Sequence, residues 1–295
     1  MKKVIARIKG GIGNQLFCYA AARRLAVVNG ADLAIDGVSG FRRDQLYRRR
    51  YMLDRFRIPV RKATPGERLE PLERYRRGMA KAFARRQPFQ RRRYVEQEGR
   101  DFDPRLLVFR VCGAVHLDGL WQSESYFKDV EAIIRADLQI ILPGDMRNRR
   151  IAAEIRDCNA VAVHVRWFEA PRDPGAGHNA SLDYYRRAMD EIRGNVSDPR
   201  FFLFSDDPAS ARVFLNLRED HSTLVDHNRG DEHACADLWL MSQCKHFVIA
   251  NSTFSWWGAW LSPHPDKIVI APGGVQSGVS SWGFHGLIPE KWITI

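Results

Sequence analysis

Short apolar runs, of the kind that buried parallel strands show, alternate with longer amphipathic stretches along most of this 295-residue chain. We expect strands at residues 4–8, 111–117, 160–165, 201–204, 247–250 and 267–272. Helical periodicity follows most of them, at residues 16–28, 127–138, 181–193, 232–244 and 253–261. Strands that alternate with helices in this way are typical of α/β proteins with parallel sheets, and this is the fold class that we predict.

A break in the pattern divides the chain. Pro143 and Gly144 interrupt it, and strands and helices alternate again after residue 151. A length of 295 residues suits two domains of ordinary size, and a hydrophobic content of 45% supports a core in each. We therefore predict an N-terminal domain at residues 1–145 and a C-terminal domain at residues 146–295.

The most informative stretch, residues 245–262, reads as strand, turn and helix. Between its two apolar blocks, Asn251, Ser252 and Thr253 provide the side chains that helix N-caps use. The second block holds three tryptophans within five residues, at positions 256, 257 and 260. Because tryptophan is costly to leave in water, we expect this helix to be buried nearly all round.

The N-terminus of that helix is a candidate binding site. We expect the backbone N–H groups of Thr253, Phe254 and Ser255 to be unpaired at this terminus, and a terminus of this kind binds anions, phosphate above all. The alternative is that Ser252 only caps a core helix.

A glycine-rich turn at residues 9–15 follows the first strand and opens a helix that Gly30 can end. Gly11 and Gly13 would let another group approach the backbone closely, although the turn lacks the full Gly-x-Gly-x-x-Gly spacing of dinucleotide-binding proteins. Asn14 and Gln15 can either hydrogen-bond a polyhydroxylated ligand or cap the helix. The residues leave both alternatives open.

Polar side chains also follow two predicted strands, at the ends where open α/β sheets bind ligands. His164 and Arg166 come at the end of one strand, and Ser205, Asp206 and Asp207 follow the other. Arg166 has a planar donor fork suited to phosphate oxygens, and the tryptophan-rich helix supplies neutral donors, which together describe a diphosphate pocket. The three residues after the second strand would bind ribose hydroxyls or a base edge.

Adjacent acids raise the alternative of a metal site. Asp206 and Asp207 carry the oxygen ligands that Mg²⁺, the only candidate, prefers. However, Asp207 followed by Pro208 is the sequence of a helix start, and no second carboxylate pair lies nearby. We therefore predict that no metal binds here.

Composition narrows the class of protein. No segment approaches the ~20 apolar residues of a membrane span, and the first apolar run is too short for a signal peptide. The five cysteines are scattered and include no Cys-x-x-Cys pair. An odd, dispersed set of thiols favours a reducing cytosol and argues against a disulfide framework or a zinc site. These features predict a cytoplasmic protein.

One segment carries the positive charge. The chain has a net charge of +11, but residues 42–93 hold 19 Lys and Arg against five acids, a net of +14, so the remainder carries −3. This basic segment reads as helical pieces broken by prolines, with arginine clusters at 48–50 and 91–93. It would suit nucleic acid, an anionic membrane surface or an acidic glycan. No nucleic-acid-binding module is recognisable, and a solvated helical face is the default interpretation.

Five motifs follow one another in an order that points to a known family. They lie at residues 10–15, 118–122, 164–166, 204–207 and 250–261. This series spans nearly the whole chain and resembles the α-1,2-fucosyltransferases of glycosyltransferase family 11, and its last motif is long and highly specific. The resemblance implies a GT-B-type α/β fold in which two Rossmann-like domains face a cleft. It places the acceptor side in the N-terminal domain and the nucleotide-sugar site in the C-terminal domain.

The resemblance also implies a reaction. A transferase of this family would move L-fucose from GDP-β-L-fucose to a sugar hydroxyl, here O-2 of a galactose in a surface glycan, with inversion and without a metal or other cofactor. It implies catalytic roles for Arg166, Glu169 and Asn14. The donor-binding positions that it implies are Gly11, Gly13, His164, Ser205, Asp206, Asp207, Asn251, Ser252, Thr253, Phe254 and Ser255.

The chain departs from the family pattern at one place. The family commonly reads His-Val-Arg-Arg-Gly-Asp, whereas Arg166 is followed here by Trp167, Phe168 and Glu169. Arg166 therefore keeps its expected diphosphate role, while the aromatic pair points to a reshaped acceptor site.

The base that accepts the acceptor proton is not identified by sequence. Glu169 and Asp173 are the carboxylates nearest in sequence to Arg166, and Asp32 and Asp118 lie in the other predicted domain. Late proton loss would make a strong base unnecessary.

Two other classes of function stay open. One is a transferase of another GDP-sugar on the same scaffold, and the other is a non-catalytic protein that binds anionic surfaces through the basic segment. As partners we expect GDP-fucose and a glycan acceptor, no nucleic acid, and peripheral contact with the inner face of an anionic membrane. The sequence does not indicate the oligomeric state.

Overall fold

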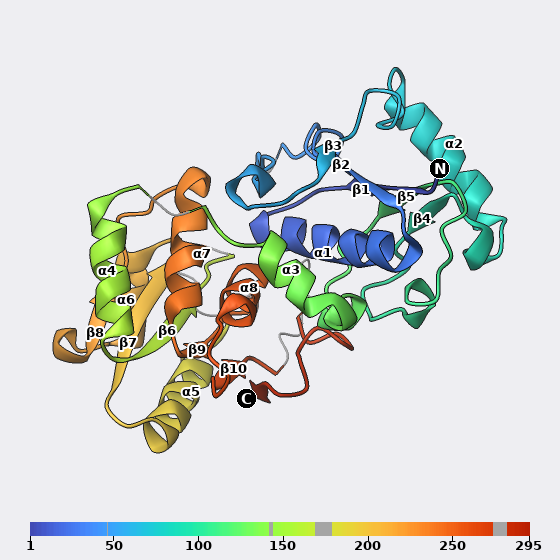
Figure 1. The fold of residues 1–295 in the computed structure, drawn as a ribbon. Coiled ribbons are helices and arrows are strands. Elements are labelled where there is room, and N and C mark those ends of the chain that lie inside the picture. Colours follow the sequence, from blue (N-terminus) through green and yellow to red (C-terminus); the bar gives the residue numbers. More distant parts are fainter. Residues whose placement is uncertain (46, 142–143, 169–178, 274–281) are drawn as a thin grey trace. The chain divides into compact units, whose positions relative to one another are not determined.

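The computed structural model describes residues 1–45, 47–141, 144–168, 179–273 and 282–295. They form two compact α/β units, each with its own parallel sheet (Figure 1). Unit 1 comprises Met1–Gln139 with His285–Leu287, and unit 2 comprises Ile140–Phe284 with Ile288–Ile295. The boundary expected after residue 145 lies a few residues beyond this division. The predicted fold class, α/β with parallel sheets, is confirmed.

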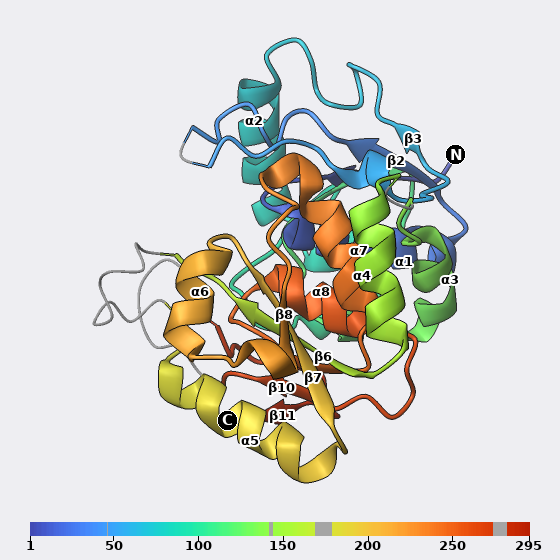
Figure 2. The same ribbon diagram turned by 90° about the vertical axis from the view of Figure 1, so that its left-hand side faces the viewer.

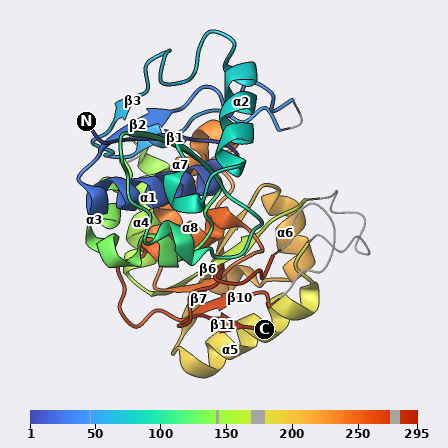
Figure 3. The same cartoon turned by 90° about the vertical axis from the view of Figure 1, so that its right-hand side faces the viewer.

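The sheet of unit 1 has the strand order β3-β2-β1-β5-β4, and all neighbouring strands are parallel. The strands are β1 (Lys3–Arg7), β2 (Asp32–Asp36), β3 (Arg61–Lys62), β4 (Tyr94–Glu96) and β5 (Ala114–Asp118). The helices are α1 (Ile12–Asn29), α2 (Glu73–Arg85) and α3 (Glu131–Asp137), with 3-10 turns at Leu53–Arg55, Phe89–Arg91, Pro104–Leu106, Glu124–Tyr126 and Lys128–Val130. Figures 1 and 3 show α1 on one face of this sheet and α2 on the other.

Helix α1 follows the glycine-rich turn as predicted. Gly10 has a φ of +77°, and a Cβ there would lie 2.9 Å from Asn14 Nδ2, so glycine alone fits without strain. At the other end Gly30 adopts the left-handed conformation, and its N–H bonds the carbonyl of Val27. Leu16 and Phe17 between them are fully buried. The end of α1 at Gly30 and the burial of Leu16 could thus be predicted from sequence, whereas Val28, the last residue of the predicted helical pattern, is 40% exposed.

The basic segment, residues 42–93, is less helical than expected. Of its described residues, α2 forms the one α-helix, and much of the rest is irregular, forms short 3-10 turns or pairs as the short strand β3. The fully buried Gln15 accounts for part of this, because its Nε2 donates to the carbonyl of Arg50 at 2.8 Å and its Oε1 accepts from the N–H of Met52 at 2.9 Å. Gln15 therefore holds the segment against α1 and is a structural residue, not a ligand contact.

The helix predicted at residues 127–138 is also shorter than expected. Phe127 has a φ of −143°, outside the helical region, so two 3-10 turns precede α3. Asp137 at the end of α3 accepts bonds from Tyr19 Oη and Arg23 Nε, both at 2.7 Å, which fasten α3 to α1.

The sheet of unit 2 has the strand order β11-β10-β9-β6-β7-β8, again parallel throughout. The strands are β6 (Asn159–Val165), β7 (Pro199–Ser205), β8 (Ser222–Leu224), β9 (His246–Val248), β10 (Val269–Ala271) and β11 (Ile293–Thr294). The helices are α4 (Met146–Arg156), α5 (Leu182–Asn195), α6 (Pro208–Leu215), α7 (Ala234–Gln243) and α8 (Thr253–Leu261), with 3-10 turns at Glu219–His221 and Asp231–His233. Figure 2 shows α4, α7 and α8 together on one face, and α5 and α6 on the other.

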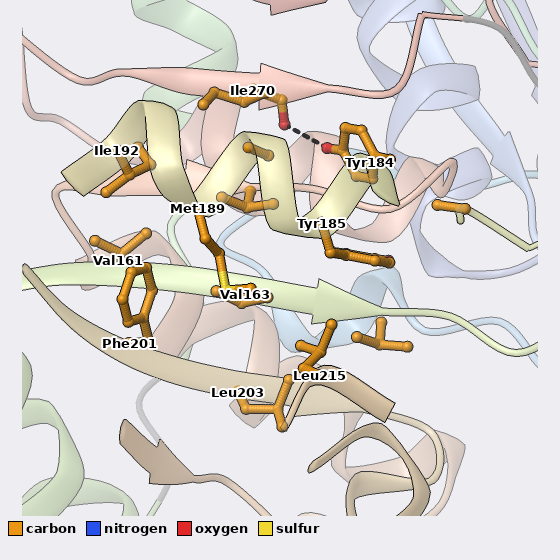
Figure 4. Packing of buried hydrophobic residues seen from close by; sticks show 14 of the residues in the cluster. Val161, Val163, Tyr184, Tyr185, Met189, Ile192, Phe201, Leu203, Leu215 and Ile270 are labelled. Atoms are coloured by element: carbon orange, nitrogen blue, oxygen red, sulfur yellow. Dashed lines mark hydrogen bonds between the residues drawn. The ribbon is translucent and has the colours of Figure 1, made fainter. Parts of the chain in front are cut away.

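The core of unit 2 under α5 shows why its strands read as continuous apolar runs. Val161 and Val163 of β6 stand beside Phe201 and Leu203 of β7 in register, and these side chains pack against α5 (Figure 4). A parallel sheet covered on both faces needs apolar residues on both sides of each strand. The β6 sequence Ala-Val-Ala-Val satisfies this requirement, and all four residues are fully buried.

Helix α8 is buried nearly all round, as its tryptophans predicted. Trp256 and Trp257 are fully buried and Trp260 is 4% exposed. Their rings meet at centroid distances of 5.0 to 6.3 Å, and Trp256 also contacts Trp292. No helix within the described residues is long and apolar enough to cross a bilayer. All five cysteines are free thiols.

We expect Trp257→Ala to lower the free energy of unfolding by roughly 3–5 kcal/mol, because it removes a large buried side chain and leaves a cavity. Urea denaturation would measure the loss. Val213→Ala, at a site that is 81% exposed, is the matched control and should change stability by no more than about 0.5 kcal/mol. Equal stability of the two variants would contradict the packing described here.

Candidate functional site

The strand order of unit 2 marks one position for a ligand. From β6 the chain moves outward through β7 to β8, and it then returns to place β9 on the opposite side of β6. Ligands of open parallel sheets bind where the order reverses, just beyond the carboxyl ends of the two strands. Here that point lies between the segments 164–166 and 251–255. The structure thus brings together two motifs that lie far apart in sequence.

Helix α8 begins at this reversal point. Ser252 is its N-cap, and its Oγ accepts a bond from the N–H of Phe254 at 3.3 Å. The capping role of Ser252 is therefore confirmed, and the expectation that the Phe254 N–H lacks a partner is wrong. Asn251 and Ser255 are buried, whereas Ser252, Thr253 and Phe254 are half-buried and can be reached from outside. The partial positive charge of the helix N-terminus still favours an anion there.

His164 faces the same helix end from β6. Its ring lies 5.4 Å from the ring of Phe254, centroid to centroid, and only 4% of the residue is exposed. Within the described part of the chain, His164 Nδ1 has no hydrogen-bond partner. Burial, followed by the charge of Arg166, lowers the pKa of His164 to about 3, so the imidazole is neutral near pH 7. A neutral, buried ring atom without a partner is a ready ligand contact.

Arg166 is held in place by Asp206. Arg166 Nη1 lies 2.9 Å from Asp206 Oδ2, and Asp206 Oδ1 accepts a bond from the N–H of Trp167 at 3.1 Å. These contacts join the carboxyl ends of β6 and β7. The Arg166 side chain is 25% exposed and its guanidinium lies 5.5 Å from the Phe168 ring centroid. Asp206, which was expected to contact ribose, therefore orients Arg166, which was expected to bind phosphate.

The two neighbours of Asp206 have local roles. Asp207 caps α6, since its carboxylate accepts from the N–H of Ser210 at 3.1 Å and from Ser210 Oγ at 2.6 Å. These bonds lower the pKa of Asp207. Ser205 Oγ accepts from the Asp207 N–H at 3.1 Å. The helix-start interpretation of Asp207 and Pro208 is confirmed. The described residues contain no group of three or more His, Cys, Asp or Glu side chains arranged to hold a metal.

Two adjacent tyrosines of α5 support the site and were not identified from sequence. Tyr185 Oη donates to the carbonyl of His164 at 2.8 Å. Tyr184 Oη lies 2.6 Å from the carbonyl oxygen of Ile249 and 2.9 Å from that of Ile270. Both side chains are buried, so each polar tip needs a partner in the interior. The sequence signal that could have identified them is a pair of tyrosines at the start of a helix that has a buried side.

The remaining predicted residues lie elsewhere. Gly11 caps α1, Gly13 lies in its first turn, and Asn14 Oδ1 accepts a bond from Gln122 Nε2 at 2.6 Å. These residues belong to unit 1, at the ends of β1 and β5, where the order of that sheet also reverses. Glu169 and Asp173 lie outside the described residues.

The two candidate bases in unit 1 are already engaged in ion pairs. Asp32 lies 2.8 Å from Arg61, and buried Asp118 lies 2.8 Å from Lys9 and 3.1 Å from Lys81. Burial alone would raise the pKa of Asp118, but Lys9 and Arg7 hold it far below its usual range. Asp118 is therefore a structural anion and not a proton acceptor.

The lining of a cavity of about 260 Å³ in unit 1 includes none of the predicted site residues. The cavity is lined by Lys81, Ala84, Arg85, Arg92, Tyr94, Glu96, Gln97 and Glu98.

Comparison with known proteins identifies relatives over the full length of the chain. Residues 48–278 match the family described as Glycosyl transferase family 11. An alpha-1,2-colitosyltransferase from Escherichia coli is 28% identical over 303 residues, which cover 100% of this chain and 99% of that protein. The galactoside 2-alpha-L-fucosyltransferase SEC1 of Bos taurus is 33% identical over 111 residues, which cover 36% of this chain and 30% of that protein.

Among solved structures, FUT1 of Arabidopsis thaliana in complex with GDP superimposes with a TM-score of 0.56. The match is 13% identical in sequence and covers 98% of this chain and 74% of that chain. The fold is therefore GT-B-type, with two Rossmann-like units, as the motifs implied. The resemblance to family 11 is confirmed.

We expect His164 to make stability depend on pH. Its folded pKa of about 3 lies below the ordinary value of 6.5, so the unfolded chain takes up a proton between these values while the folded chain does not. Stability contributed by neutral His164 is thus complete above pH 6.5 and is lost as the pH falls toward 3. Urea denaturation at pH 7 and pH 5 should show a loss about 2 kcal/mol larger for the native protein than for His164→Gln.

The control for this experiment is His221→Gln, whose side chain is 62% exposed and which should behave as the native protein does. The same pH dependence in the native protein and in His164→Gln would mean that His164 is not buried as a neutral group.

Proposed function

Because the chain belongs to glycosyltransferase family 11, we propose that it transfers L-fucose from GDP-β-L-fucose to O-2 of a galactose in a surface glycan. The observation that carries the proposal is the paired Arg166 and Asp206 beside His164 and the N-terminus of α8, at the reversal point of the unit 2 sheet. The named activity of the bovine relative supports the fucosyl donor and the galactoside acceptor.

The site chemistry suits departure of a diphosphate. In an inverting transfer the acceptor hydroxyl forms a bond to the anomeric carbon on the face opposite GDP, and the bond from that carbon to the diphosphate oxygen breaks. The leaving diphosphate gains negative charge in the transition state. Groups that bind this charge more strongly then than in the ground state lower the barrier.

Arg166 and the start of α8 are the groups assigned to that charge. A guanidinium has five N–H donors, so Arg166 can keep its bond to Asp206 and still donate to phosphate. Thr253 and Ser255 lie in the first turn of α8, where backbone donors and the helix dipole favour an anion. Neutral His164 adds a polar contact to the donor without adding charge. This set would replace a divalent cation as the ligand of the diphosphate.

A colitosyl donor is the second candidate, favoured by the match to the colitosyltransferase over the full chain. Colitose lacks one hydroxyl of fucose, at C3, so the two donors differ by a single polar contact. Incubating the purified protein with GDP-fucose, GDP-colitose and GDP-mannose, each with a panel of galactosides, and determining the product linkage by NMR distinguishes them. Exclusive use of GDP-colitose would overturn the fucosyl proposal and leave the family assignment intact.

We expect Arg166→Ala to reduce the rate of transfer on the order of 10²-fold or more, as the loss of a donor to transition-state charge does. Arg166→Lys should restore only part of the rate, because an ammonium cannot pair with Asp206 and phosphate in the same planar geometry. Steady-state kinetics with GDP-fucose provide the measurement.

Arg187→Ala is the matched control, because Arg187 is an exposed arginine of the same unit that pairs along α5 with Asp183. It should transfer at the native rate. Near-native turnover of Arg166→Ala would place the diphosphate site elsewhere.

We also expect transfer to persist in EDTA. Arg166 and the α8 terminus would supply the charge stabilisation that a metal provides in other transferases. The rate with and without EDTA, and after addition of Mg²⁺ or Mn²⁺, tests this expectation. A large loss of transfer rate in EDTA that only the metal restores would indicate that Asp206 and Asp207 bind a metal after all.

A further inference from the structure

Helix α2 of unit 1 presents its apolar residues to solvent. Leu72 at its N-cap is 72% exposed, Tyr75 68%, Met79 56% and Phe83 66%. Their spacing of three, four and four residues places them in one stripe along the helix. Single exposed apolar residues are common, but a continuous stripe of four large ones marks an interaction surface. We call these four residues the α2 stripe.

The opposite side of α2 is polar and faces the sheet. Lys81 Nζ lies 3.1 Å from Asp118 Oδ2 and also bonds Glu96, while Arg77 lies 3.8 Å from Asp36. Ala84 is the buried residue of this helix. A surface helix ordinarily turns its apolar side to the core and its charged side to water. In α2 this arrangement is reversed, because ion pairs hold the charged side on the sheet.

Unbalanced positive charge surrounds the stripe. Arg76 and Arg86 fall beside the stripe by their spacing along the helix. Within the described part of the chain Arg86 forms no ion pair, and Arg76 donates to a backbone oxygen, that of Glu70, at 3.0 Å. Both are exposed, and residues 42–93 together carry a net charge of +14. A partner for this surface must therefore accept both apolar side chains and cations.

We propose that α2 lies in the plane of an anionic membrane, with the α2 stripe in the boundary between headgroups and acyl chains and with Arg76 and Arg86 on lipid phosphates. Amphipathic helices with an apolar side and a basic rim bind membranes in this way. A nucleic acid would use the arginines but not the stripe, and a second copy would bring another +14 against the first. The sequence placed the membrane contact on the clusters 48–50 and 91–93, whereas the structure assigns its centre to α2.

Vesicle binding tests the proposal without reference to transferase activity. Flotation with equimolar phosphatidylcholine and phosphatidylglycerol vesicles is compared with phosphatidylcholine alone, at low and high salt. The native protein should bind the anionic vesicles at least about tenfold more tightly, and less so in salt. The combined variant Tyr75→Ser, Met79→Ser and Phe83→Ser should lose about tenfold or more of this affinity. Arg76→Gln with Arg86→Gln should also bind more weakly and depend less on salt.

The matched control is Val108→Ser, Met146→Ser and Val213→Ser, which removes exposed apolar residues elsewhere and should bind as the native protein does. Thermal unfolding should be unchanged in the α2 serine variant, because its side chains face solvent. Native affinity of that variant would show purely electrostatic binding and overturn the proposal. Equal affinity for both vesicles, or a dimer in sedimentation velocity that the serine variant abolishes, would also overturn it.

Discussion

The binding end of the unit 2 sheet depends on hydrogen bonds from two buried tyrosines to strand carbonyls. Tyr185 bonds the carbonyl of His164, and Tyr184 bonds those of Ile249 and Ile270. The carbonyl of Ile270 also accepts the N–H of Ile249 at 2.9 Å, so Tyr184 adds a second donor to a bond that already joins β10 to the end of β9. The two tyrosines thus fasten α5 to β6, to β10 and to the residue that follows β9. The polar side chains that follow those strands then project from a rigid edge.

On that edge, electrostatics assigns different roles to similar residues. Arg166 is partly exposed and forms an ion pair with Asp206, whereas His164 is buried and neutral. Asp206 and Asp207 are neighbours in sequence, yet one orients the arginine and the other caps α6. Adjacent carboxylates can diverge in this way because successive backbone positions point in different directions. The cation that faces the site is thus held by its own counter-ion.

Unit 1 deals with its positive charge differently. Its buried Asp118 is surrounded by Arg7, Lys9 and Lys81, so one carboxylate organises several cations. Lys81 belongs to α2, and this attraction turns the charged side of the helix inward. The apolar side must then face outward. The membrane surface proposed for α2 is therefore a consequence of a buried charge in the sheet beneath it.

Sequence alone determined the elements with strong local signals. These are the apolar strands β6, β7 and β9, the glycine-bounded helix α1, the Asp207 cap of α6 and the tryptophan-rich α8, whose burial follows from composition. Family membership could also be read from the ordered motifs, four of which lie within the residues that match the family.

Tertiary structure decided what depends on residues far apart in the chain. Asp206 meets Arg166 across two strands, Gln15 holds the basic segment in an irregular path, and Tyr184 and Tyr185 reach three strand ends. The inverted α2 is the clearest case. Its helical periodicity marks two sides, but periodicity does not say which side faces the core, and the buried Asp118 decides it.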